Sequence, residues 1–410
     1  MKQQTIQKNK LLEGWKIVKL GDICEKPQYG YTCKTSKEEV GPILLRITDI
    51  GSFGKVDFNN VKFAKISKDE ENKFVLSEGD ILIARSGSIG KVYLHQKQKS
   101  KVIFASYLVR FKPKKEIVNP EFLFYYLYSP QFVQYVEENK TGVTQFNLNA
   151  QKMSKFELVL PPLTTQKLIV KKLNSFFEKY NKLKQEKQKA KRDYEKIFGS
   201  VISSLIPSED KLPDGWESDK LGNIAKVTSG GTPLRSKKEY WERGTIPWLK
   251  SGELKDNEIT KVEEKITKEG LKNSSAKYFD LNTVLIALYG ATVGKTAILK
   301  VKSTTNQAVC GISPNKEILD YEYLFYFLLS KRKYLIKKSF GGAQPNISQT
   351  IIKSLEIPLP NVETQRRIVK KLEAIKQKYS KISEEQEKVD KWLEQLPKSV
   401  LNKAFKGELV

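Results

Sequence analysis

The feature that most constrains this 410-residue sequence is that it repeats itself once. Short matches recur in the same order about 200 residues apart, and chance similarity would not keep that order over such a length. The matched pairs are Gly14-Trp15 with Gly215-Trp216, Ile81–Ala84 with Val284–Ala287, Gly90-Lys91 with Gly294-Lys295, residues 121–127 with 322–328, and Thr165-Gln166 with Thr364-Gln365. The chain is therefore a diverged tandem duplication, and its fold must consist of two related halves.

Each copy divides into a mixed region followed by a long helix. In the mixed regions, short β-rich runs such as residues 102–111 are separated by Gly, Pro, Ser and Asn, which is typical of strands joined by turns. Residues 120–127 follow Asn119 and begin with proline, as helices often do. We therefore expect mixed domains over residues 1–163 and 207–362, and spacer helices over 164–206 and 363–410.

Both expected helices carry a heptad stripe. Apolar positions step by four and three, and the polar exceptions, Lys187 and Gln386, stand at equivalent places. This sustained pattern predicts a coiled coil, in which a polar pair commonly fixes the register. The expected seam comprises Ile169, Leu173, Phe176, Tyr180 and Leu183 in the first helix, and Ile368, Leu372, Ile375, Tyr379 and Ile382 in the second. Pro397 should break or kink the second helix, leaving a short terminal helix over residues 399–405.

The two stripes also predict how the helices pair. An exposed stripe of apolar side chains would be costly, so each helix needs a partner. The first helix leads from the first mixed domain to the second, and the second helix must run back to lie against it. The prediction is an α+β fold in which two pseudo-twofold-related α/β domains are separated by an antiparallel two-helix coiled coil.

The charge of the chain points to an anionic partner. Its 73 Lys and Arg residues outnumber 47 Asp and Glu, leaving a net charge of +26, which favours double-stranded DNA or another nucleic acid. A helix of this kind is roughly 55 Å long, and B-DNA presents the same face about every 34–36 Å. Two domains held apart by such a rod predict a split target with an unread gap of fixed length. A coiled-coil scaffold that never touches DNA is the alternative from another class.

Cysteine, histidine and hydropathy exclude other classes. The three cysteines have no CxxC spacing and His95 is the single histidine, so neither a disulfide framework nor a metal site of the usual kind is expected. Residues 1–10 lack the apolar core of a secretory signal, and the longest apolar runs are far shorter than the roughly 20 residues of a membrane span. We expect a cytoplasmic protein with no membrane partner.

A glycine-rich turn is similar to a nucleotide-binding loop. Residues 290–296 read Gly-Ala-Thr-Val-Gly-Lys-Thr, but a P-loop needs four residues between its glycines and this turn has three. The equivalent turn at residues 87–91 is followed by valine instead of Ser or Thr. A β-turn that brings a lysine near DNA phosphate, or a purely structural turn, explains the pattern better. A self-contained nucleotide-binding enzyme is the less favoured alternative, and no catalytic residues are expected.

The doubled order of these motifs resembles the specificity subunits of type I restriction–modification systems. The resemblance covers essentially the whole chain and rests on the paired Gly-Trp openings, the two glycine turns, Gln145-x-Asn147 with Gln344-x-Asn346, Leu160-Pro161 with Leu359-Pro360, and the ending at residues 404–409. It implies two target-recognition domains, one for each half of an asymmetric bipartite DNA site. It also implies recruitment of two adenine-N6 methyltransferase subunits and two restriction–translocase subunits. S-adenosylmethionine, ATP and Mg²⁺ would belong to those partners, and this chain would bind no cofactor.

Candidate DNA-binding residues fall into two groups. Residues shared by the copies are expected to support the fold, phosphate contact or partner binding, whereas divergent loop residues are expected to read bases. Arg85 or Arg235 could read guanine, and Asn306 or Gln307 could read adenine. The full predicted set is Lys34, Arg85, Ser86, Lys91, Ser106, Gln145, Asn147, Arg235, Lys237, Tyr289, Lys295, Asn306, Gln307, Gln344 and Asn346.

Overall fold

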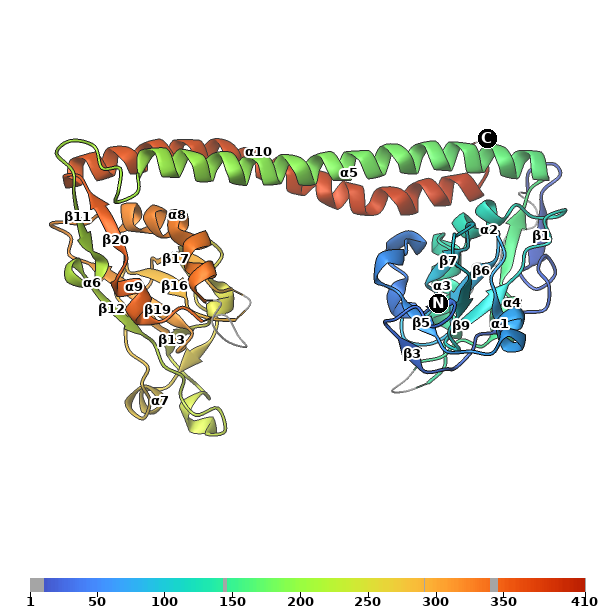
Figure 1. The fold of residues 1–410 in the computed structure, drawn as a ribbon, viewed down its shortest axis with the longest axis horizontal. Helices are drawn as coiled ribbons and strands as arrows, with labels where there is room; N and C mark the ends of the chain where they lie inside the picture. The colour runs from blue at the N-terminus through green and yellow to red at the C-terminus, as the bar shows by residue number, and fades with distance from the viewer. Residues whose placement is uncertain (1–10, 143–145, 291, 340–345, 410) are drawn as a thin grey trace. The chain divides into compact units, whose positions relative to one another are not determined.

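The computed structural model describes residues 11–142, 146–290, 292–339 and 346–409, and for residues 382–387 it describes only the backbone. The chain forms two compact units. The first unit extends to Gln185 and resumes at Glu387, and the second spans Glu186–Gln386. Each unit contains one mixed domain and parts of two long helices, α5 (Leu163–Leu205) and α10 (Val362–Phe405) (Figure 1).

The mixed domain of the first unit is built on two four-stranded sheets with strand orders β2-β9-β6-β7 and β3-β5-β4-β8. A third, two-stranded sheet pairs β1 with β10 and so joins the two ends of the domain. The strands are β1 (Lys16–Lys19), β2 (Gln28–Tyr29), β3 (Thr35–Ser36), β4 (Ile43–Leu45), β5 (Lys62–Ala64), β6 (Ile81–Ala84), β7 (Val92–Leu94), β8 (Val102–Phe104), β9 (Leu108–Phe111) and β10 (Glu157–Leu160). The short helices are α1 (Lys68–Phe74), α2 (Pro120–Tyr126), α3 (Pro130–Asn139) and α4 (Ala150–Ser154).

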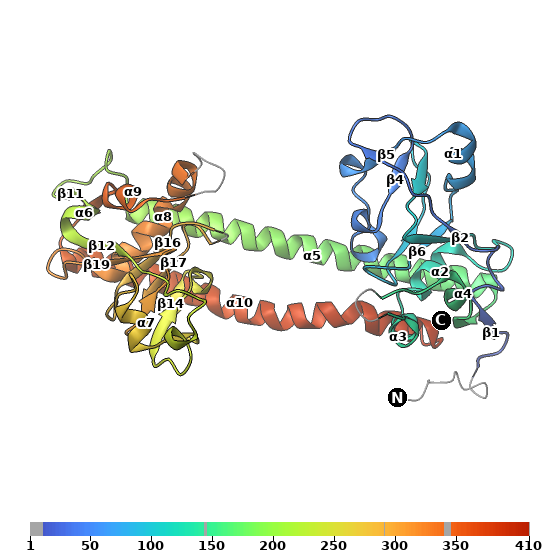
Figure 2. The ribbon, with the colours of Figure 1, turned by 90° about the horizontal axis from the view of Figure 1, so that it is seen from below.

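The mixed domain of the second unit has a related layout. A five-stranded sheet has the order β12-β19-β16-β17-β14, a three-stranded sheet has the order β15-β13-β18, and β11 pairs with β20. The strands are β11 (Glu217–Lys220), β12 (Ala225–Ser229), β13 (Ile246–Leu249), β14 (Asn257–Ile259), β15 (Lys265–Ile266), β16 (Val284–Ala287), β17 (Thr296–Leu299), β18 (Thr304–Thr305), β19 (Val309–Pro314) and β20 (Glu356–Leu359). The helices are α6 (Leu221–Ile224), α7 (Lys268–Lys272), α8 (Tyr321–Ser339) and α9 (Gln349–Lys353). Helix α8 packs against β16, β17 and β19 (Figures 1 and 2).

Local sequence explains the main difference between the copies. In the first domain Ser129 and Pro130 interrupt the helical stretch, because proline cannot continue a helix and the Ser129 side chain caps α3 by accepting the N–H of Phe132. The second copy has Ser330-Lys331 there, and α8 continues without a break through Ser339. The matched central strands β6 and β16 are buried along their whole length, as expected for strands covered on both faces.

A buried glutamine joins each mixed domain to its long helix. The side-chain amide of Gln166 donates to the carbonyls of Ile117 and Pro161, and its oxygen accepts the N–H of Asn119 at 2.7 Å. Gln365 repeats all three bonds with Ile318, Pro360 and Asp320. Both glutamines are fully buried. The shared glutamine is therefore explained by three backbone groups that would otherwise lose their partners.

The long helices lie antiparallel within each unit. In the first unit, the beginning of α5 and the end of α10 share one core, in which Phe405 packs on Phe122 and Tyr126. In the second unit, the end of α5 and the beginning of α10 share another core, and the rings of Tyr194 and Tyr379 stack. The predicted α+β class and antiparallel helix pair are confirmed.

Three predictions about the helices are not confirmed. The terminal helix is wrong, one seam residue is exposed, and the side chain of another lies outside the described residues. Helix α10 runs through Pro397 to Phe405, so the separate terminal helix is wrong. A proline at this position frees the carbonyl of Leu393, and the Tyr180 hydroxyl of α5 donates to that carbonyl at 3.1 Å. Leu183, placed in the seam, is 44% exposed, and the side chain of Ile382 lies outside the described residues.

The other seam residues are at least partly buried. Ile169, Leu173, Ile368 and Leu372 are buried. Phe176, Tyr180, Ile375 and Tyr379 have intermediate exposure. In each helix, the seam residues nearest its first residue are thus more buried than those one or two turns further on.

Candidate nucleic-acid interface

In the first domain, three segments far apart in the sequence meet at the end of β6. The backbone N–H of Arg85 donates to Tyr107 in the turn between β8 and β9, and its carbonyl accepts the N–H of Leu148. Ser86 forms an isolated β-bridge with Asn147. Ser106 belongs to the same β8–β9 turn and donates its N–H to Tyr31. The structure therefore brings together Arg85, Ser86, Ser106 and Asn147 from the predicted set.

Exposed aromatic side chains accompany these residues. The guanidinium of Arg85 lies 4.8 Å from the ring centre of Tyr29, and the ammonium of Lys140 lies 4.7 Å from that of Phe146. Tyr29, Tyr107 and Phe146 are 40–55% exposed. Cations beside exposed aromatic rings suit contact with nucleic acid, because they offer both phosphate neutralisation and stacking surfaces.

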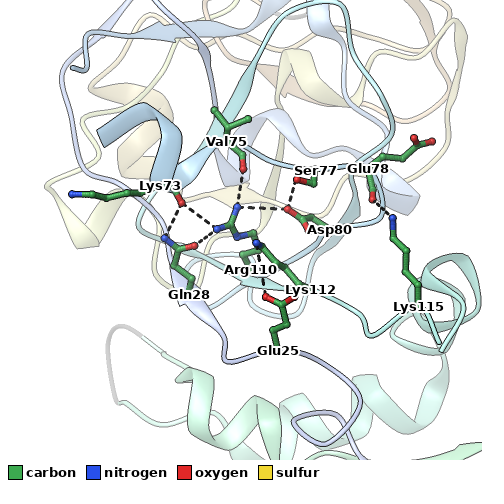
Figure 3. Close-up of polar contacts among 10 residues, drawn as sticks. All are labelled: Glu25, Gln28, Lys73, Val75, Ser77, Glu78, Asp80, Arg110, Lys112 and Lys115. Carbon is green, nitrogen blue, oxygen red and sulfur yellow. Dashed lines mark hydrogen bonds and ion pairs between the residues drawn. The ribbon is translucent and has the colours of Figure 1, made fainter. Parts of the chain in front are cut away.

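A buried arginine fixes the strand that carries Tyr29. Figure 3 shows Arg110 of β9 directed at the Val75 carbonyl, Gln28 and Asp80. Its Nη1 lies 3.6 Å from the Asp80 carboxylate, and both residues are about 5% exposed. Burial raises the pKa of Asp80 and lowers the pKa of Arg110, because each charge has left water. The network ties Gln28, next to Tyr29, to the end of α1.

The second domain repeats these backbone hydrogen bonds and this β-bridge with different side chains. We call the shared backbone arrangement the frame. The N–H of Leu288 donates to Ala308, and the carbonyl of Leu288 accepts the N–H of Ile347. Tyr289 forms an isolated β-bridge with Asn346, as Ser86 does with Asn147 in the first domain. Where the first domain carries Arg85, Ser86 and Ser106, the second carries Leu288, Tyr289 and Gln307. One frame therefore presents two different sets of polar groups.

Amide side chains border this second frame. The Thr232 hydroxyl donates to the side-chain oxygen of Gln307. The N–H of Asn306 donates to Leu249. Among the residues that the structure describes, no donor reaches the buried Oδ1 of Asn306, and the same is true of Oδ1 of Asn147.

Arg235 lies in an aromatic setting. Its guanidinium carbon is 3.6 Å from the ring centre of Trp241 and 4.7 Å from that of Trp248. Nη1 donates to one oxygen of Glu264, and Lys250 lies 2.9 Å from the other oxygen. Burial alone would raise the pKa of Glu264, but the bonds from these two cations outweigh it, and the pKa falls below its ordinary value.

The shared lysines have partners inside the protein. Lys91 donates to the carbonyl of Ile50 at 2.7 Å, and Lys295 donates to the carboxylate of Asp256 at 2.8 Å. Gly90 and Gly294 adopt positive φ values of 79° and 75°, which explains why both copies keep glycine before the lysine. These lysines hold the two glycine turns in place, so the structural reading of these turns gains support over phosphate contact.

Four predicted residues remain: Lys34, Lys237, Gln145 and Gln344. Lys34 is exposed. Lys237 lies 3.7 Å from Glu239 and donates to the Tyr240 hydroxyl. Gln145 and Gln344 lie outside the described residues.

Asp256 lies among charged groups at the second glycine turn. Its carboxylate accepts from Lys295, Arg332 and the N–H of Thr296. Burial alone would raise the pKa of Asp256, but these donors lower it below the ordinary 3.8. Its ionised form therefore stabilises the fold at neutral pH, and this contribution is lost as pH falls through the lowered pKa.

We expect the substitution Asp256→Asn to lower the free energy of unfolding by about 2 kcal/mol at pH 7. At pH 2 the difference from the wild type should be smaller, since the contribution of the ionised carboxylate is lost as pH falls through the lowered pKa of Asp256. Urea denaturation at the two pH values measures this. The matched change Asp280→Asn removes a 79% exposed carboxylate and should cost far less; a deficit for Asp256→Asn that does not change with pH would contradict the assignment.

Sequence reasoning missed the groups that position the predicted residues. The sequence pattern gives no reason to choose Trp241, Trp248, Glu264 or Arg110 as positioning groups. The one available signal is in the divergent loop at residues 28–37, which combines Tyr29 and Tyr31 with two lysines, whereas residues 228–237 contain two basic residues and no aromatic residue.

Comparison with known proteins decides the family. A family model described as the type I restriction modification DNA specificity domain matches this chain twice, over residues 12–192 and 213–390. The chain belongs to this family of specificity proteins. The predicted resemblance is thereby confirmed, and so is its duplicated organisation.

Named specificity subunits are similar over part or all of the chain. The EcoR124I/EcoR124II specificity subunit of Escherichia coli is 30% identical over 216 residues, which is 52% of each protein. The MjaVIII specificity subunit of Methanocaldococcus jannaschii is 26% identical and covers 97% of this chain and 93% of its own. Both are named as specificity subunits of restriction enzymes, consistent with a role other than catalysis.

Solved structures confirm the fold. A chain from a structure describing complex assembly and conformational transition of the type I R-M system aligns with a TM-score of 0.76 at 22% identity, covering 97% of this chain and 99% of its own. The HsdS subunit from Thermoanaerobacter tengcongensis aligns with a TM-score of 0.53 at 22% identity, covering 97% and 98%. Within the described ranges, no helix has the length and hydropathy of a membrane span, and no cluster of three or more His, Cys, Asp or Glu could hold a metal ion.

Proposed function

We propose that this chain is the non-catalytic DNA-specificity subunit of a type I restriction–modification system and that each mixed domain recognises one half of a bipartite target. One observation carries this proposal: the two domains share a backbone frame but present different polar side chains on it. A shared frame allows both domains to approach DNA alike, and unlike side chains allow the half-sites to differ. The net charge of +26 supports an anionic partner.

The proposed contacts follow from the side chains on each frame. In the first domain Arg85 reads guanine, with Ser86, Ser106 and Asn147 beside it. In the second domain Arg235 reads guanine, while Asn306 and Gln307 read adenine near Tyr289 and Asn346. Lys34 and Lys237 are the proposed phosphate contacts. Gln145 and Gln344 are proposed to contact the DNA backbone or a partner subunit. Lys91 and Lys295 act through the turns they hold.

The proposed assembly places catalysis in other subunits. Two adenine-N6 methyltransferase subunits and two restriction–translocase subunits would join this chain, and S-adenosylmethionine, ATP and Mg²⁺ would bind to them. Support comes from the family and from the similar structure, which was determined for assembly of a type I R-M system. Long helices α5 and α10 would keep the spacing of the two domains constant, and hence the length of the unread gap.

Binding by the complex with its methyltransferase tests this function. On a duplex carrying the methylated motif, we expect the affinity to fall steeply with salt, because Lys and Arg displace counterions from phosphates. Inserting one base pair into the gap should weaken specific binding by more than about tenfold, because it rotates and shifts one half-site relative to the other. The insertion should leave binding to unrelated duplex unchanged. Salt-independent binding would favour the scaffold alternative instead, and tolerance of the insertion would refute a fixed gap.

A further inference from the structure

The setting of Arg235 differs from that of an ordinary surface arginine. Its side chain is half-exposed, yet its guanidinium is held over two indole rings that meet at 86° with centres 4.9 Å apart. Both rings are themselves fixed. The indole N–H of Trp248 donates to Gly231 at 2.9 Å, and that of Trp241 donates to Leu234 at 3.2 Å.

A carboxylate completes this setting. The carboxylate of Glu264 accepts a hydrogen bond from Nη1 of Arg235. The backbone carbonyl of Glu264 accepts the backbone N–H of Trp248 at 2.8 Å. The Trp241 ring, whose centre lies 3.6 Å from the guanidinium carbon, and the Glu264 carboxylate together restrict how the guanidinium can turn. Among the residues that the structure describes, Glu264 is the hydrogen-bond partner of this half-exposed guanidinium, so its remaining N–H groups can donate to a bound base.

The location of Arg235 matches the proposed interface. Trp248 and Leu249 of β13 pair in parallel with Thr304 and Thr305 of β18, and Asn306 and Gln307 follow directly in the chain. Gly231, which holds Trp248, also donates its N–H to Thr305 and precedes Thr232, the partner of Gln307. Arg235 therefore belongs to the same surface as the amides on the second frame.

We infer that Glu264, Trp241 and Trp248 are positioning residues that make Arg235 a guanine reader in the second half-site. The inference rests on the proposed function and adds the residues that determine one base. A phosphate contact would need no fixed plane, and the Glu264 carboxylate beside it would repel a phosphate. A guanine edge offers O6 and N7, two acceptors that a fixed guanidinium can meet together. Because the protein already holds the Arg235 side chain in place, that side chain loses less conformational entropy on binding than a freely moving arginine would.

Base-substituted duplexes test the inference once the methylated motif is known. The complex with its methyltransferase is titrated with duplexes in which each position of both half-sites is changed in turn to the other three bases. We expect one position of the second half-site to require guanine, with about 10–100-fold weaker binding of other bases. Arg235→Lys keeps the charge but lacks the two-pronged geometry, and should reduce this preference at that position to about threefold or less.

Glu264→Gln separates positioning from charge. It should weaken the guanine preference at the same position, while affinity for unrelated duplex rises because a negative charge has been removed. The matched control Glu263→Gln removes the same charge from the exposed neighbouring residue, and should raise unrelated binding without altering the preference. Preferences in the first half-site should stay unchanged in all three variants, and thermal melting should show that each variant is folded.

The outcomes distinguish the inference from the function on which it rests. If the wild-type complex prefers no sequence in either half-site, the proposed function is wrong. If the wild type recognises both half-sites but Arg235→Lys or Glu264→Gln leaves every preference intact, the proposed function stands and this inference is wrong. The inference is also wrong if Glu263→Gln changes the preference as much as Glu264→Gln.

Discussion

Replacing residues 228–354 with the corresponding segment of a related specificity subunit is expected to change one half of the methylated motif and leave the other half unaltered. The segment carries every proposed base contact of the second domain, from Arg235 to Asn346. The β11–β20 pair stays with the recipient chain, and the N–H of Leu221 donates to Leu355 just outside the exchanged segment. The first boundary falls within β12, and the second lies just before β20. The recipient therefore keeps the elements that join the domain to α5 and α10.

Methylation mapping of the exchanged chain together with the recipient's methyltransferase measures this result. The gap should keep its length, because both long helices are unchanged. A reciprocal exchange within the first domain serves as the control and should alter only the opposite half. A change in both halves, or a motif that stays the same in a folded and active chimera, would show that the domains do not read independently.

Arg110→Met is expected to destabilise the first unit by about 3–5 kcal/mol. The substitution leaves the carbonyl of Val75 without its donor and removes the ion-pair partner of the buried Asp80 carboxylate. The carbonyl of Lys73 loses one donor but keeps the side-chain amide of Gln28. Because Asp80 would lose its ion-pair partner, the double variant Arg110→Met with Asp80→Asn should recover part of the loss. Urea denaturation and hydrogen exchange within the first unit measure these changes.

An exposed pair provides the matched control for Arg110. Lys112 lies two residues further along, and its ammonium is 3.9 Å from the Glu25 carboxylate in an exposed pair. Lys112→Met should therefore cost less than about 1 kcal/mol. Equal losses for Arg110→Met and Lys112→Met would mean that the buried network contributes nothing special to the stability of the domain.

The duplication and the heptad stripes made the overall fold predictable. These signals depend on periodicity within the sequence, and the two long helices that they predict are observed as α5 and α10. Pro397 misled the prediction because its local effect is offset by Tyr180, more than 200 residues earlier in the chain, whose hydroxyl takes the freed carbonyl. Local rules cannot include a partner that only the tertiary fold supplies.

The candidate interface was predictable only in part. Arg85 and Arg235 could be proposed from divergent loops, because such loops are suited to base reading. Their aromatic partners come partly from other segments, Tyr29 from β2 and Trp248 from β13. Lys91 and Lys295 looked available for phosphate, but Ile50 and Asp256 are brought to them by the fold. Spacing in a single sequence does not reveal such distant contacts.

Mapping adenine methylation in cells that carry this chain and its methyltransferase tests the central claim most directly. The structure predicts an asymmetric motif of two short, different sequences separated by a gap of constant length. A contiguous or palindromic motif would contradict the assignment of one half-site to each domain.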